Sequence, residues 1–351
     1  MHLVVLTQVL DRHDAVLGFF HGWCEEFAGH LARLTVFAQR VGETRLPANV
    51  EVRSLGKEAG GGRITMARRL VSGLTGLRGG SRPDAVWVHM VPRLVLYAAP
   101  ALLPRRIPMY LWYTHKAVDR SLRLAVPLVR KVFTASEESF RLPSGAAKRV
   151  VTGHGIDCER FAPGAAPRDI DVLCVGRIAP SKGQDELLSA LQRLPACPRT
   201  VIAGDILLAG DAPYRDRVAA QAGAGALAGR VELAGAVPWL EVAGLMARSR
   251  VLVNASRTGS IDKVVLEAMA CGTLPLTCNE SFAPLLSSEL SGRLMFRRDD
   301  PADLAAGLQR LLSLPGPDAA ALGARLRGQV LAGHDLRRLV PRMLDEMEAG
   351  A

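Results

Sequence analysis

One segment of the sequence decides the fold, and it reads Asp171-Val172-Leu173-Cys174-Val175-Gly176-Arg177-Ile178-Ala179-Pro180-Ser181-Lys182-Gly183. It begins with a short apolar run typical of a buried parallel strand, which we expect over residues 170–175. Residues 184–194 follow with leucines at helical spacing, which predicts a helix. The segment therefore predicts a strand, a polar loop and a helix, which together form the repeating unit of an α/β fold.

The same alternation runs along the whole chain of 351 residues. Strands are expected over residues 2–7, 34–39, 50–54, 84–89, 108–114, 131–135, 148–152, 170–175, 199–203, 230–234, 250–255, 274–277 and 292–296. Helices are expected over residues 18–31, 63–78, 119–130, 184–194, 212–222, 239–248, 263–271 and 301–313. This number of strands is larger than one strongly twisted open sheet usually contains. We therefore predict an α/β protein with two doubly wound, Rossmann-like domains that face each other across a ligand-binding cleft.

A Gly- and Pro-rich stretch, 153–167, divides the series of strands near its middle. The predicted domains are residues 1–152 and 169–333, joined by a linker over 153–168. The last amphipathic window, 334–348, has two interpretations. It is either a terminal helix that closes the second domain or a helix that returns to pack on the first.

Composition places the chain among ordinary globular proteins. Hydrophobic residues make up 49% and charged residues 22% of the sequence, which excludes a disordered chain. The six cysteines show no zinc-type spacing, and most lie in apolar runs, so we expect a reducing, cytoplasmic location. The N-terminus is interpreted as a first strand rather than a signal peptide, and the longest apolar stretch, 94–103, is too short to span a bilayer.

The net charge of +10 is concentrated in the first half of the sequence. Residues 1–150 carry 22 basic and 11 acidic residues, or +11, whereas residues 151–351 carry 22 and 23, or −1. The basic residues gather in the window 63–78, at Arg105-Arg106 and over 120–131. One interpretation is docking on an anionic membrane surface. The other is that the apolar stripe of 63–78 is core and its arginines are solvated. No nucleic-acid motif accompanies these segments, so we expect no nucleic-acid partner.

Two cations follow the strand expected at 170–175. Arg177 and Lys182 stand where a parallel strand ends and a helix begins. Free N–H groups and the positive end of the helix dipole favour phosphate at such a place, and both cations can bind it. The alternative is that both are solvated loop charges.

A lone carboxylate lies in the second informative segment, residues 256–272. Between residues 264 and 271 every side chain except Glu267 is apolar, which predicts a buried helix. Ser260 or Asp262 can cap that helix, and Gly272 can end it. A buried carboxylate needs a partner, either a ligand hydroxyl or a backbone or arginine group of the protein.

The two segments together resemble the signatures of retaining GT-B glycosyltransferases of family four, the glycosyl transferases group 1. The resemblance rests on Val175-Gly176-Arg177, Pro180, Lys182-Gly183 and Leu266-Glu267-Ala268-Met269-Ala270-Cys271-Gly272. Gly153-His154-Gly155-Ile156-Asp157 and Val231-Glu232-Leu233-Ala234-Gly235-Ala236-Val237-Pro238 are similar to further blocks of that family, in the same order. The similarity covers about residues 131–290.

The resemblance implies a role for each matching residue. Arg177 and Lys182 would hold the diphosphate of a nucleotide-sugar donor and stabilise charge on the leaving phosphate. Glu267 would bind the ribose hydroxyls, and the backbone at Ala236 and Val237 would lie along the edge of the nucleobase. The helix at 334–348 would be the crossover helix of the GT-B fold, so that residues 334–351 join the first domain. No cofactor is expected, because the UDP- or GDP-linked sugar is itself the substrate. No metal is expected either, because no Asp-x-Asp metal motif is recognised.

Besides His154, which stands where the family has Asn, one departure from the family matters. The family usually has a second Glu eight residues before Glu267, where this chain has Gly259. We expect the segment Gly259-Ser260-Ile261-Asp262-Lys263 to contact the donor sugar instead, through Asp262 or the N–H groups of 259–261. The alternative is that Asp262 only caps the helix.

The first half offers two further candidate site residues. Gly18 opens the first helix, in a loop that faces the substrates in similar enzymes. His115 follows the strand expected at 108–114, and its position resembles that of a histidine that contacts the donor sugar. The alternatives are a solvated loop and a histidine satisfied within its own loop.

We therefore predict a retaining, metal-independent glycosyltransferase, cytoplasmic or peripheral on the cytoplasmic face of a membrane. It would move a sugar to a glycan or lipid-linked acceptor in cell-surface polysaccharide or glycolipid assembly. Two alternatives remain: a nucleotide-sugar 2-epimerase of the same architecture, and a catalytically degenerate GT-B scaffold at the membrane.

Overall fold

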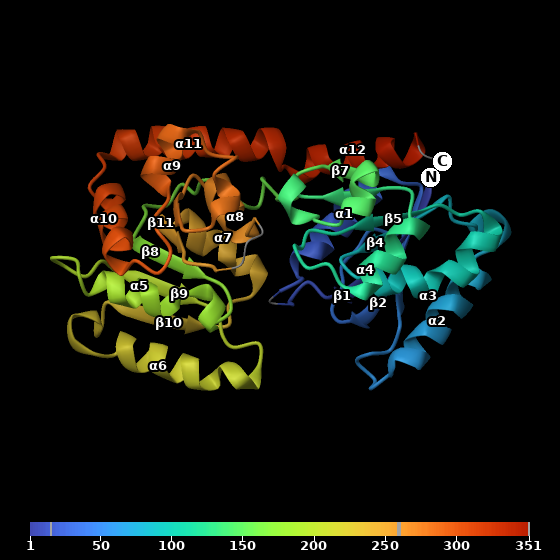
Figure 1. Cartoon of the computed structure of the whole chain (residues 1–351), viewed down its shortest axis with the longest axis horizontal. Coiled ribbons are helices and arrows are strands. Elements are labelled where there is room, and N and C mark those ends of the chain that lie inside the picture. Colours follow the sequence, from blue (N-terminus) through green and yellow to red (C-terminus); the bar gives the residue numbers. More distant parts are fainter. Residues whose placement is uncertain (15, 258–260, 350–351) are drawn as a thin grey trace. The chain divides into compact units, whose positions relative to one another are not determined.

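The structure is a computed structural model that describes residues 1–14, 16–257 and 261–349. The chain divides into two compact units. Unit 1 consists of Met1–Gly155 and Asp335–Ala351, and unit 2 consists of Ile156–His334. Each unit is built on one parallel sheet with helices on both faces (Figure 1). The predicted α/β class with two doubly wound sheets is confirmed.

Within its described residues, unit 1 contains a seven-stranded parallel sheet in the order β3-β2-β1-β4-β5-β6-β7. Its strands are β1 (His2–Leu10), β2 (Arg33–Val41), β3 (Val50–Ser54), β4 (Ala85–His89), β5 (Met109–Trp112), β6 (Val132–Thr134) and β7 (Arg149–Val151). Its α-helices are α1 (Phe19–His30), α2 (Arg63–Gly76), α3 (Pro92–Leu102), α4 (Arg120–Ala125) and α12 (Leu336–Glu348). The strand order reverses direction between β1 and β4, which makes this pair the topological switch point.

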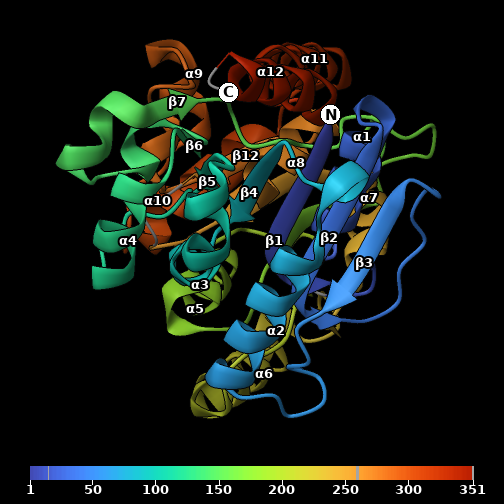
Figure 2. The ribbon, with the colours of Figure 1, turned by 90° about the vertical axis from the view of Figure 1, so that its right-hand side faces the viewer.

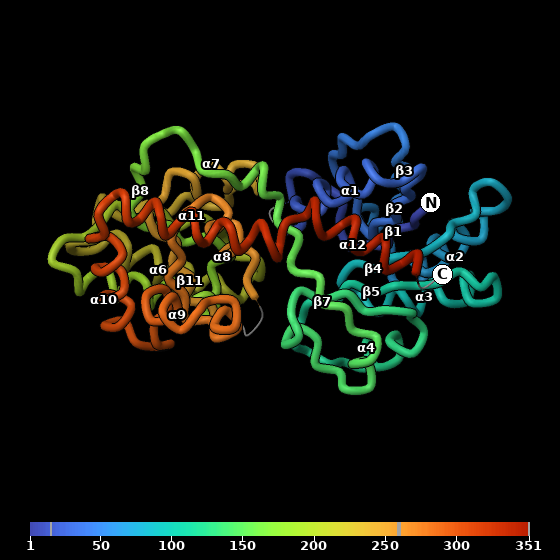
Figure 3. The backbone as a smooth tube through the Cα atoms, turned by 90° about the horizontal axis from the view of Figure 1, so that it is seen from above, coloured from blue at the N-terminus to red at the C-terminus, as the bar shows by residue number. Residues whose placement is uncertain are grey.

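Two apolar cores cover the two faces of this sheet. Residues of α2, α3 and α4 pack on one face, where Figure 2 shows α2 and α3 in front of the strands. Residues of α1 and α12 pack on the other, and Figure 3 shows the red tube of α12 beside α1. The apolar stripe of α2 belongs to the first core, because Leu70, Leu74 and Leu77 are buried. The alternative in which that stripe docks on a membrane is therefore wrong for these leucines.

Unit 2 contains, in its described part, a five-stranded parallel sheet in the order β10-β9-β8-β11-β12. Its strands are β8 (Ile170–Val175), β9 (Thr200–Ala203), β10 (Val231–Gly235), β11 (Ser249–Asn254) and β12 (Leu274–Thr277). Its α-helices are α5 (Gln184–Leu191), α6 (Ala212–Ala222), α7 (Trp239–Ala247), α8 (Lys263–Ala270), α9 (Ser288–Leu294), α10 (Pro301–Leu312) and α11 (Gly316–Gly333). Helices α6, α5 and α10 contact one another in a row, and so do α7, α8 and α11. The switch point of this sheet lies between β8 and β11.

One predicted strand is wrong. Residues 292–296 fall mainly in α9, and only Met295 forms an isolated bridge, to Thr277. The Ser287 side chain accepts a hydrogen bond from the Leu290 N–H and starts the helix. Leu290 and Leu294, four residues apart, then bury one helical face. Helices α3 and α11 lie outside the helical windows named from the sequence.

The two places where the chain crosses between the units are tied together inside unit 2. The N–H of Ile156 donates to the carbonyl of His334 at 2.7 Å. On the unit 1 side, the indole N–H of Trp23 donates to the carbonyl of Gly155 at 3.1 Å. Both crossing points are therefore held by specific hydrogen bonds.

Candidate functional site

The predicted donor-site residues of unit 2 lie at the carboxyl-terminal edge of its sheet. Arg177 follows β8 by two residues, and Lys182 ends a 3-10 turn, η6 (Pro180–Lys182). Glu267 lies in α8, which follows β11. Strands β8 and β11 are the switch-point pair, where open α/β sheets bind their ligands.

A close approach of two loops shapes this edge. Gly183 has φ of 66°, and a Cβ atom there would lie 2.8 Å from the carbonyl oxygen of Ala255. The N–H of Arg257 also donates to the carbonyl of Ser181 at 2.9 Å. The loop after β8 therefore lies directly against the loop after β11, and only glycine fits at position 183.

Lys182 is held by two side chains from the β11 side. Its Nζ donates to Ser256 Oγ and to Asp262 Oδ1, each at 3.1 Å. Asp262 stands at the N-cap position of α8, but within the described residues its side chain makes no capping hydrogen bond. The interpretation of Asp262 as only a helix cap is therefore wrong. Its carboxylate is the counter-ion of Lys182.

Two buried amides, which the sequence analysis missed, hold the other oxygen of Asp262. Asn254 Nδ2 donates to Asp262 Oδ2 at 3.3 Å, and Asn279 Nδ2 donates to the same oxygen at 3.4 Å. Thr277 Oγ1 donates to Asn254 Oδ1 at 3.0 Å. These residues come from the ends of β11 and β12, so the sheet itself fixes the carboxylate.

Arg177 differs from Lys182 in being exposed. Its backbone carbonyl accepts a hydrogen bond from Gln184 Nε2 at 3.0 Å. In the part of the chain that the structure describes, its guanidinium has no hydrogen-bond or ion-pair partner. The side chain is therefore available to an anionic ligand.

Glu267 is buried, with only 7% of its surface exposed. Trp239 Nε1 donates to Glu267 Oε1 at 3.4 Å, and Lys263 stands one helical turn before it. Burial raises the pKa of Glu267, while the positive charge of Lys263 lowers it. Burial likewise lowers the pKa of Lys263, while Glu267 raises it. Within the described part of the protein, Glu267 thus interacts with an indole N–H and with the charge of a lysine, and not with the arginine group that was one of the alternatives.

Trp239 links Glu267 to the segment predicted to edge the base. It begins α7 directly after Val237 and Pro238, and Val237 is half-buried. The guanidinium of Arg160 lies 5.1 Å from the indole ring. The sequence analysis missed this tryptophan. The one available signal was an indole N–H at the start of an apolar helix, which needs a partner when buried.

The remaining residues of the predicted sugar-contact segment are only partly described. Gly259 and Ser260 lie outside the described residues. Ile261 is buried, and Lys263 is half-buried. Gly272 has φ of 67° and directly follows Cys271, the C-cap of α8, as expected of the residue that ends this helix.

In unit 1, Gly18 and His115 lie near the carboxyl-terminal edge of its own sheet. Gly18 is buried and directly precedes α1. His115 is exposed three residues after β5, and its Nδ1 accepts a hydrogen bond from the N–H of Ala117 at 3.0 Å. Whether either residue contacts a substrate stays a prediction.

The switch point of unit 1 also contains a strained residue that the sequence did not reveal. Met90, directly after β4, has φ of 63°, which is rare for a residue with a side chain. The preceding His89 is buried, its Nδ1 lies 3.2 Å from Thr7 Oγ1, and its ring stacks on Phe20. Strain of this kind is concentrated at functional sites. The β1–β4 edge is thus a second candidate binding edge.

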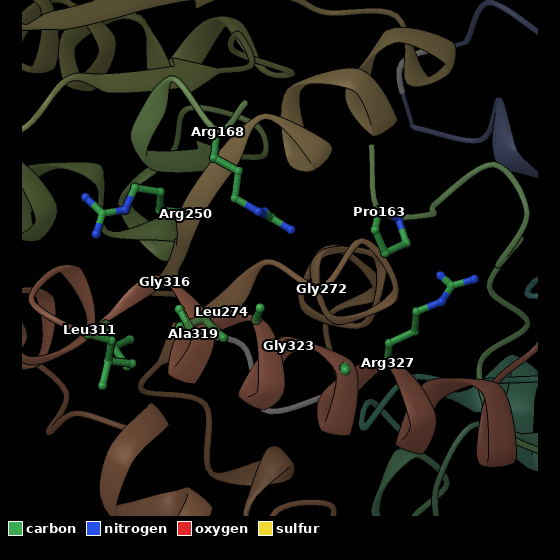
Figure 4. A pocket seen from close by; sticks show the side chains of 13 residues that line it. Pro163, Arg168, Arg250, Gly272, Leu274, Leu311, Gly316, Ala319, Gly323 and Arg327 are labelled. Atoms are coloured by element: carbon green, nitrogen blue, oxygen red, sulfur yellow. The ribbon is translucent and has the colours of Figure 1, made fainter. Parts of the chain in front are cut away.

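A pocket of about 410 Å³ lies at the opposite, amino-terminal edge of the unit 2 sheet (Figure 4). Arg168, Arg250, Leu274 and residues of α11 line it. Arg168 and Arg327 donate to backbone carbonyls around the end of α8, so they cap that helix. None of the described site residues predicted above lines this pocket.

The expectation that the chain has no Asp-x-Asp motif is wrong, because Asp169 and Asp171 form such a pair at this same amino-terminal edge. Arg248 donates to Asp169 and lowers the pKa of that carboxyl to about 2, and Arg250 pairs with Asp171 at 3.2 Å. Among the described residues, no group of three or more His, Cys, Asp or Glu side chains is placed to hold a metal ion. In that same part of the chain, no helix combines the length and apolar character needed to cross a bilayer.

Comparison with known sequences identifies similarity mainly in one half of the chain. The family model of glycosyl transferases group 1 matches residues 169–314. One component of the phosphatidylinositol N-acetylglucosaminyltransferase of Arabidopsis thaliana is 25% identical over 185 residues, which are 51% of this chain and 40% of that protein. D-inositol 3-phosphate glycosyltransferase from Mycobacterium avium is 30% identical over 187 residues, 48% of this chain and 42% of that protein. The matched region spans about two fifths of the length of these relatives.

Solved structures match over almost the whole chain. HepE of Anabaena, solved with UDP and glucose, has a TM-score of 0.76 at 17% identity and covers 99% of both chains. Sucrose-phosphate synthase of Thermosynechococcus elongatus has a TM-score of 0.76 at 17% identity and covers 100% of both chains. The fold is GT-B, built from two Rossmann-like units.

Proposed function

We propose, from the premise that residues 169–314 belong to the glycosyl transferases group 1, that this chain is a retaining, metal-independent glycosyltransferase. It transfers a sugar from a UDP- or GDP-linked donor to a glycan or lipid-linked acceptor. The observation that carries the proposal is the placement of Arg177, Lys182 and Glu267 at the switch-point edge of one sheet.

In this proposal, unit 2 binds the donor through three parts of the nucleotide sugar. Lys182 and the exposed guanidinium of Arg177 bind the diphosphate. Glu267 accepts hydrogen bonds from the ribose hydroxyls, and the backbone beside Val237 edges the base. HepE, which has the same fold, was solved with UDP and with UDP-glucose, which supports a nucleotide-sugar donor.

The reaction needs charge stabilisation more than it needs a protein base. The bond between the sugar C1 and the diphosphate oxygen breaks, and a bond from C1 to an acceptor oxygen forms on the same face. The acceptor proton passes to the departing phosphate oxygen, so the configuration at C1 is retained. Arg177 and Lys182 stabilise the negative charge that develops on the leaving diphosphate, an electrostatic contribution of a few kcal/mol per contact.

An anionic acceptor fits the charge of unit 1. The surplus of +11 lies in residues 1–150. The two curated relatives above are named for phosphatidylinositol and for an inositol phosphate, both of which carry phosphate. We propose a phosphate-bearing or lipid-linked acceptor at the cytoplasmic face of a membrane, in polysaccharide or glycolipid assembly.

One face of unit 1 combines apolar and basic groups in a way that suits a membrane surface. A groove of about 490 Å³ is lined by Leu103, Leu128, Arg106 and Arg130 among others, and Leu103 is half exposed. Basic residues around exposed apolar side chains favour anionic lipid headgroups. Binding to anionic vesicles that falls when Arg106 and Arg130 are replaced by Ser, but not when Arg63 and Arg68 are, supports this surface. Equal binding by both variants contradicts it.

The experiment that tests the proposed activity uses a panel of UDP- and GDP-linked sugars. The purified chain is incubated with each sugar and with lipid-linked or phosphate-bearing acceptors, and release of nucleoside diphosphate is measured. Acceptor-dependent release from one donor is the expected result. Conversion of the nucleotide sugar to its epimer without release favours the 2-epimerase, and the absence of binding to any donor favours the degenerate scaffold.

A further inference from the structure

The lysine assigned to the donor diphosphate is already paired with an anion of the protein. Lys182 Nζ lies 3.1 Å from Asp262 Oδ1, and both side chains are largely shielded from solvent, at 21% and 13% exposure. A partly buried ion pair of this kind is weakly screened. Any phosphate that binds Lys182 must therefore share it with Asp262 or replace Asp262.

Asp262 itself is not free to move away. Asn254 and Asn279 both donate to its second oxygen, and both amides are buried at the ends of paired strands. Lys182, by contrast, carries its charge on a flexible four-carbon stem and ends a short turn. Of the two partners, the lysine is the one that can swing toward a ligand.

We propose that Asp262 is the resting counter-ion of Lys182 and acts as a competitor of the donor diphosphate for this lysine. The inference rests on the proposed function. Asp262 holds the ammonium of Lys182 in position before the donor binds. A ligand replaces Asp262 as the partner of Lys182 favourably only if it carries more negative charge than one carboxylate. Asp262 also weakens the hold of Lys182 on the nucleoside diphosphate that remains after transfer.

This role differs from the sugar contact expected for Asp262 from the sequence. Both carboxylate oxygens have protein partners, which orient them toward Lys182 and the two amides. If Asp262 contacts the sugar, loss of its carboxylate weakens binding of the nucleotide sugar and leaves binding of the nucleoside diphosphate unchanged. If Asp262 competes for Lys182, loss of its carboxylate strengthens the binding of both ligands.

The test is a double-mutant cycle on the binding of UDP, GDP and inorganic pyrophosphate, measured by titration calorimetry. The four proteins are the unaltered chain, Asp262→Asn, Lys182→Met and the double variant. Asp262→Asn is expected to tighten diphosphate binding by roughly fivefold to tenfold, as the loss of a partly buried competing charge implies. In the Lys182→Met background the same change is expected to have less than half that effect, because the competition acts through the lysine.

Asp205→Asn is the matched control, because Asp205 is an exposed carboxylate at the end of neighbouring β9. It is expected to leave diphosphate affinity unchanged. The inference is overturned if Asp205→Asn tightens diphosphate binding as much as Asp262→Asn does. It is also overturned if Asp262→Asn tightens diphosphate binding equally with and without Lys182. In either case a general charge effect explains the tighter binding. Weaker diphosphate binding by Asp262→Asn overturns the inference as well.

The pyrophosphate measurement separates failure of the inference from failure of the proposed function. If pyrophosphate binds and Asp262→Asn tightens it, while no nucleotide binds, the competition stands and the donor assignment fails. If UDP or GDP binds and Asp262→Asn does not tighten it, the donor assignment stands and the inference fails. Absence of binding by all three ligands in every variant contradicts both.

Discussion

Three charged side chains of unit 2 are held by the fold in different ways. Lys182 is paired with Asp262, Glu267 is buried beside Trp239, and Arg177 is exposed. Removing one member of a buried pair destabilises the fold, because the other member is left without its partner. Only Arg177 can be removed without breaking a contact between described residues. Its substitution is therefore the cleanest probe of the donor site.

Arg177→Ala is expected to lower kcat about 100-fold to 1,000-fold, which is typical of removing one donor that stabilises charge in a transition state. The melting temperature should stay the same. Steady-state release of nucleoside diphosphate and a thermal melt measure the two effects. Arg230→Ala, an exposed arginine at the amino-terminal edge of the same sheet, is the control and should retain activity. Comparable losses in both variants would contradict the assignment of Arg177.

Glu267→Gln is expected to weaken the binding of UDP or GDP by about tenfold to a hundredfold, since hydrogen bonds to a charged group contribute about 1.5–3 kcal/mol. Trp239→Phe keeps the ring but removes the N–H that donates to Glu267, and a smaller loss is expected. Titration calorimetry with both nucleotides gives the comparison. Unchanged affinity in Glu267→Gln would remove this residue from the ribose site.

Sequence patterns identify charged site residues better than neutral ones. Arg177, Lys182 and Glu267 stand out because a charge in a loop or in an apolar helix needs an explanation. Asn254 and Asn279 give no such signal, although both hold Asp262. Their contact depends on the pairing of β11 with β12, which brings together residues that are distant in the sequence. No local pattern can predict that contact.

At the level of elements, the turn between β8 and α5 sets the spacing of the proposed donor site. Gly183→Ala is expected to destabilise the chain by about 1–3 kcal/mol, because the new side chain combines a left-handed backbone with a clash against Ala255. Gly292→Ala in α9 is the control, because a Cβ atom there meets open space. It should leave stability equal or slightly raised. Thermal and urea unfolding of both variants measure the difference, and equal stability would contradict the strain.

The end of α11 contains a buried histidine that makes stability depend on pH. Burial lowers the pKa of His334 to about 4, whereas an unfolded histidine titrates near 6.5. Between these values the unfolded chain binds more protons, so stability falls as the pH decreases from about 6.5 toward 4.

His334→Gln is expected to reduce the loss of unfolding free energy between pH 7 and pH 5 by about 2 kcal/mol. Urea unfolding at the two pH values measures it. The unaltered chain, unfolded under the same conditions, gives the pH dependence for comparison. If His334→Gln shows that same dependence, His334 is not its source.

Periodicity predicts most elements correctly, and it fails where apolar runs are short. Residues 292–296 have the composition of a strand, but the cap at Ser287 and the spacing of Leu290 and Leu294 fold them as a helix. Residues of α3 form one apolar run with Pro100, and α11 is rich in Ala and Gly. Helix α11 therefore lacks the contrast between faces that marks an amphipathic helix.

At the level of the whole molecule, α12 completes unit 1 although it comes last in the sequence. Val340 and Met343 are buried in its second core, and Tyr110 Oη donates to the carbonyl of Met347 at 2.8 Å. The sequence left two interpretations for this helix. An amphipathic pattern shows that one face is buried, but it does not show which partner buries it.

Val340→Asp is therefore expected to destabilise unit 1 by several kcal/mol, because it buries an unpaired carboxylate in that core. Arg338→Asp, at an exposed position of the same helix, should change stability little. Limited proteolysis with mass spectrometry shows which unit is cleaved first. Cleavage confined to unit 2 in Val340→Asp would contradict the placement of α12 in unit 1.

The central claim is that one nucleotide sugar is held by Arg177, Lys182 and Glu267 together. The most direct measurement is a crystal structure of this chain with UDP or GDP bound. We expect the diphosphate within hydrogen-bond distance of Lys182 and Arg177, and the ribose hydroxyls on the carboxylate of Glu267. A nucleotide bound at the amino-terminal edge of the sheet, or one that contacts the lysine while its ribose lies away from Glu267, would contradict it.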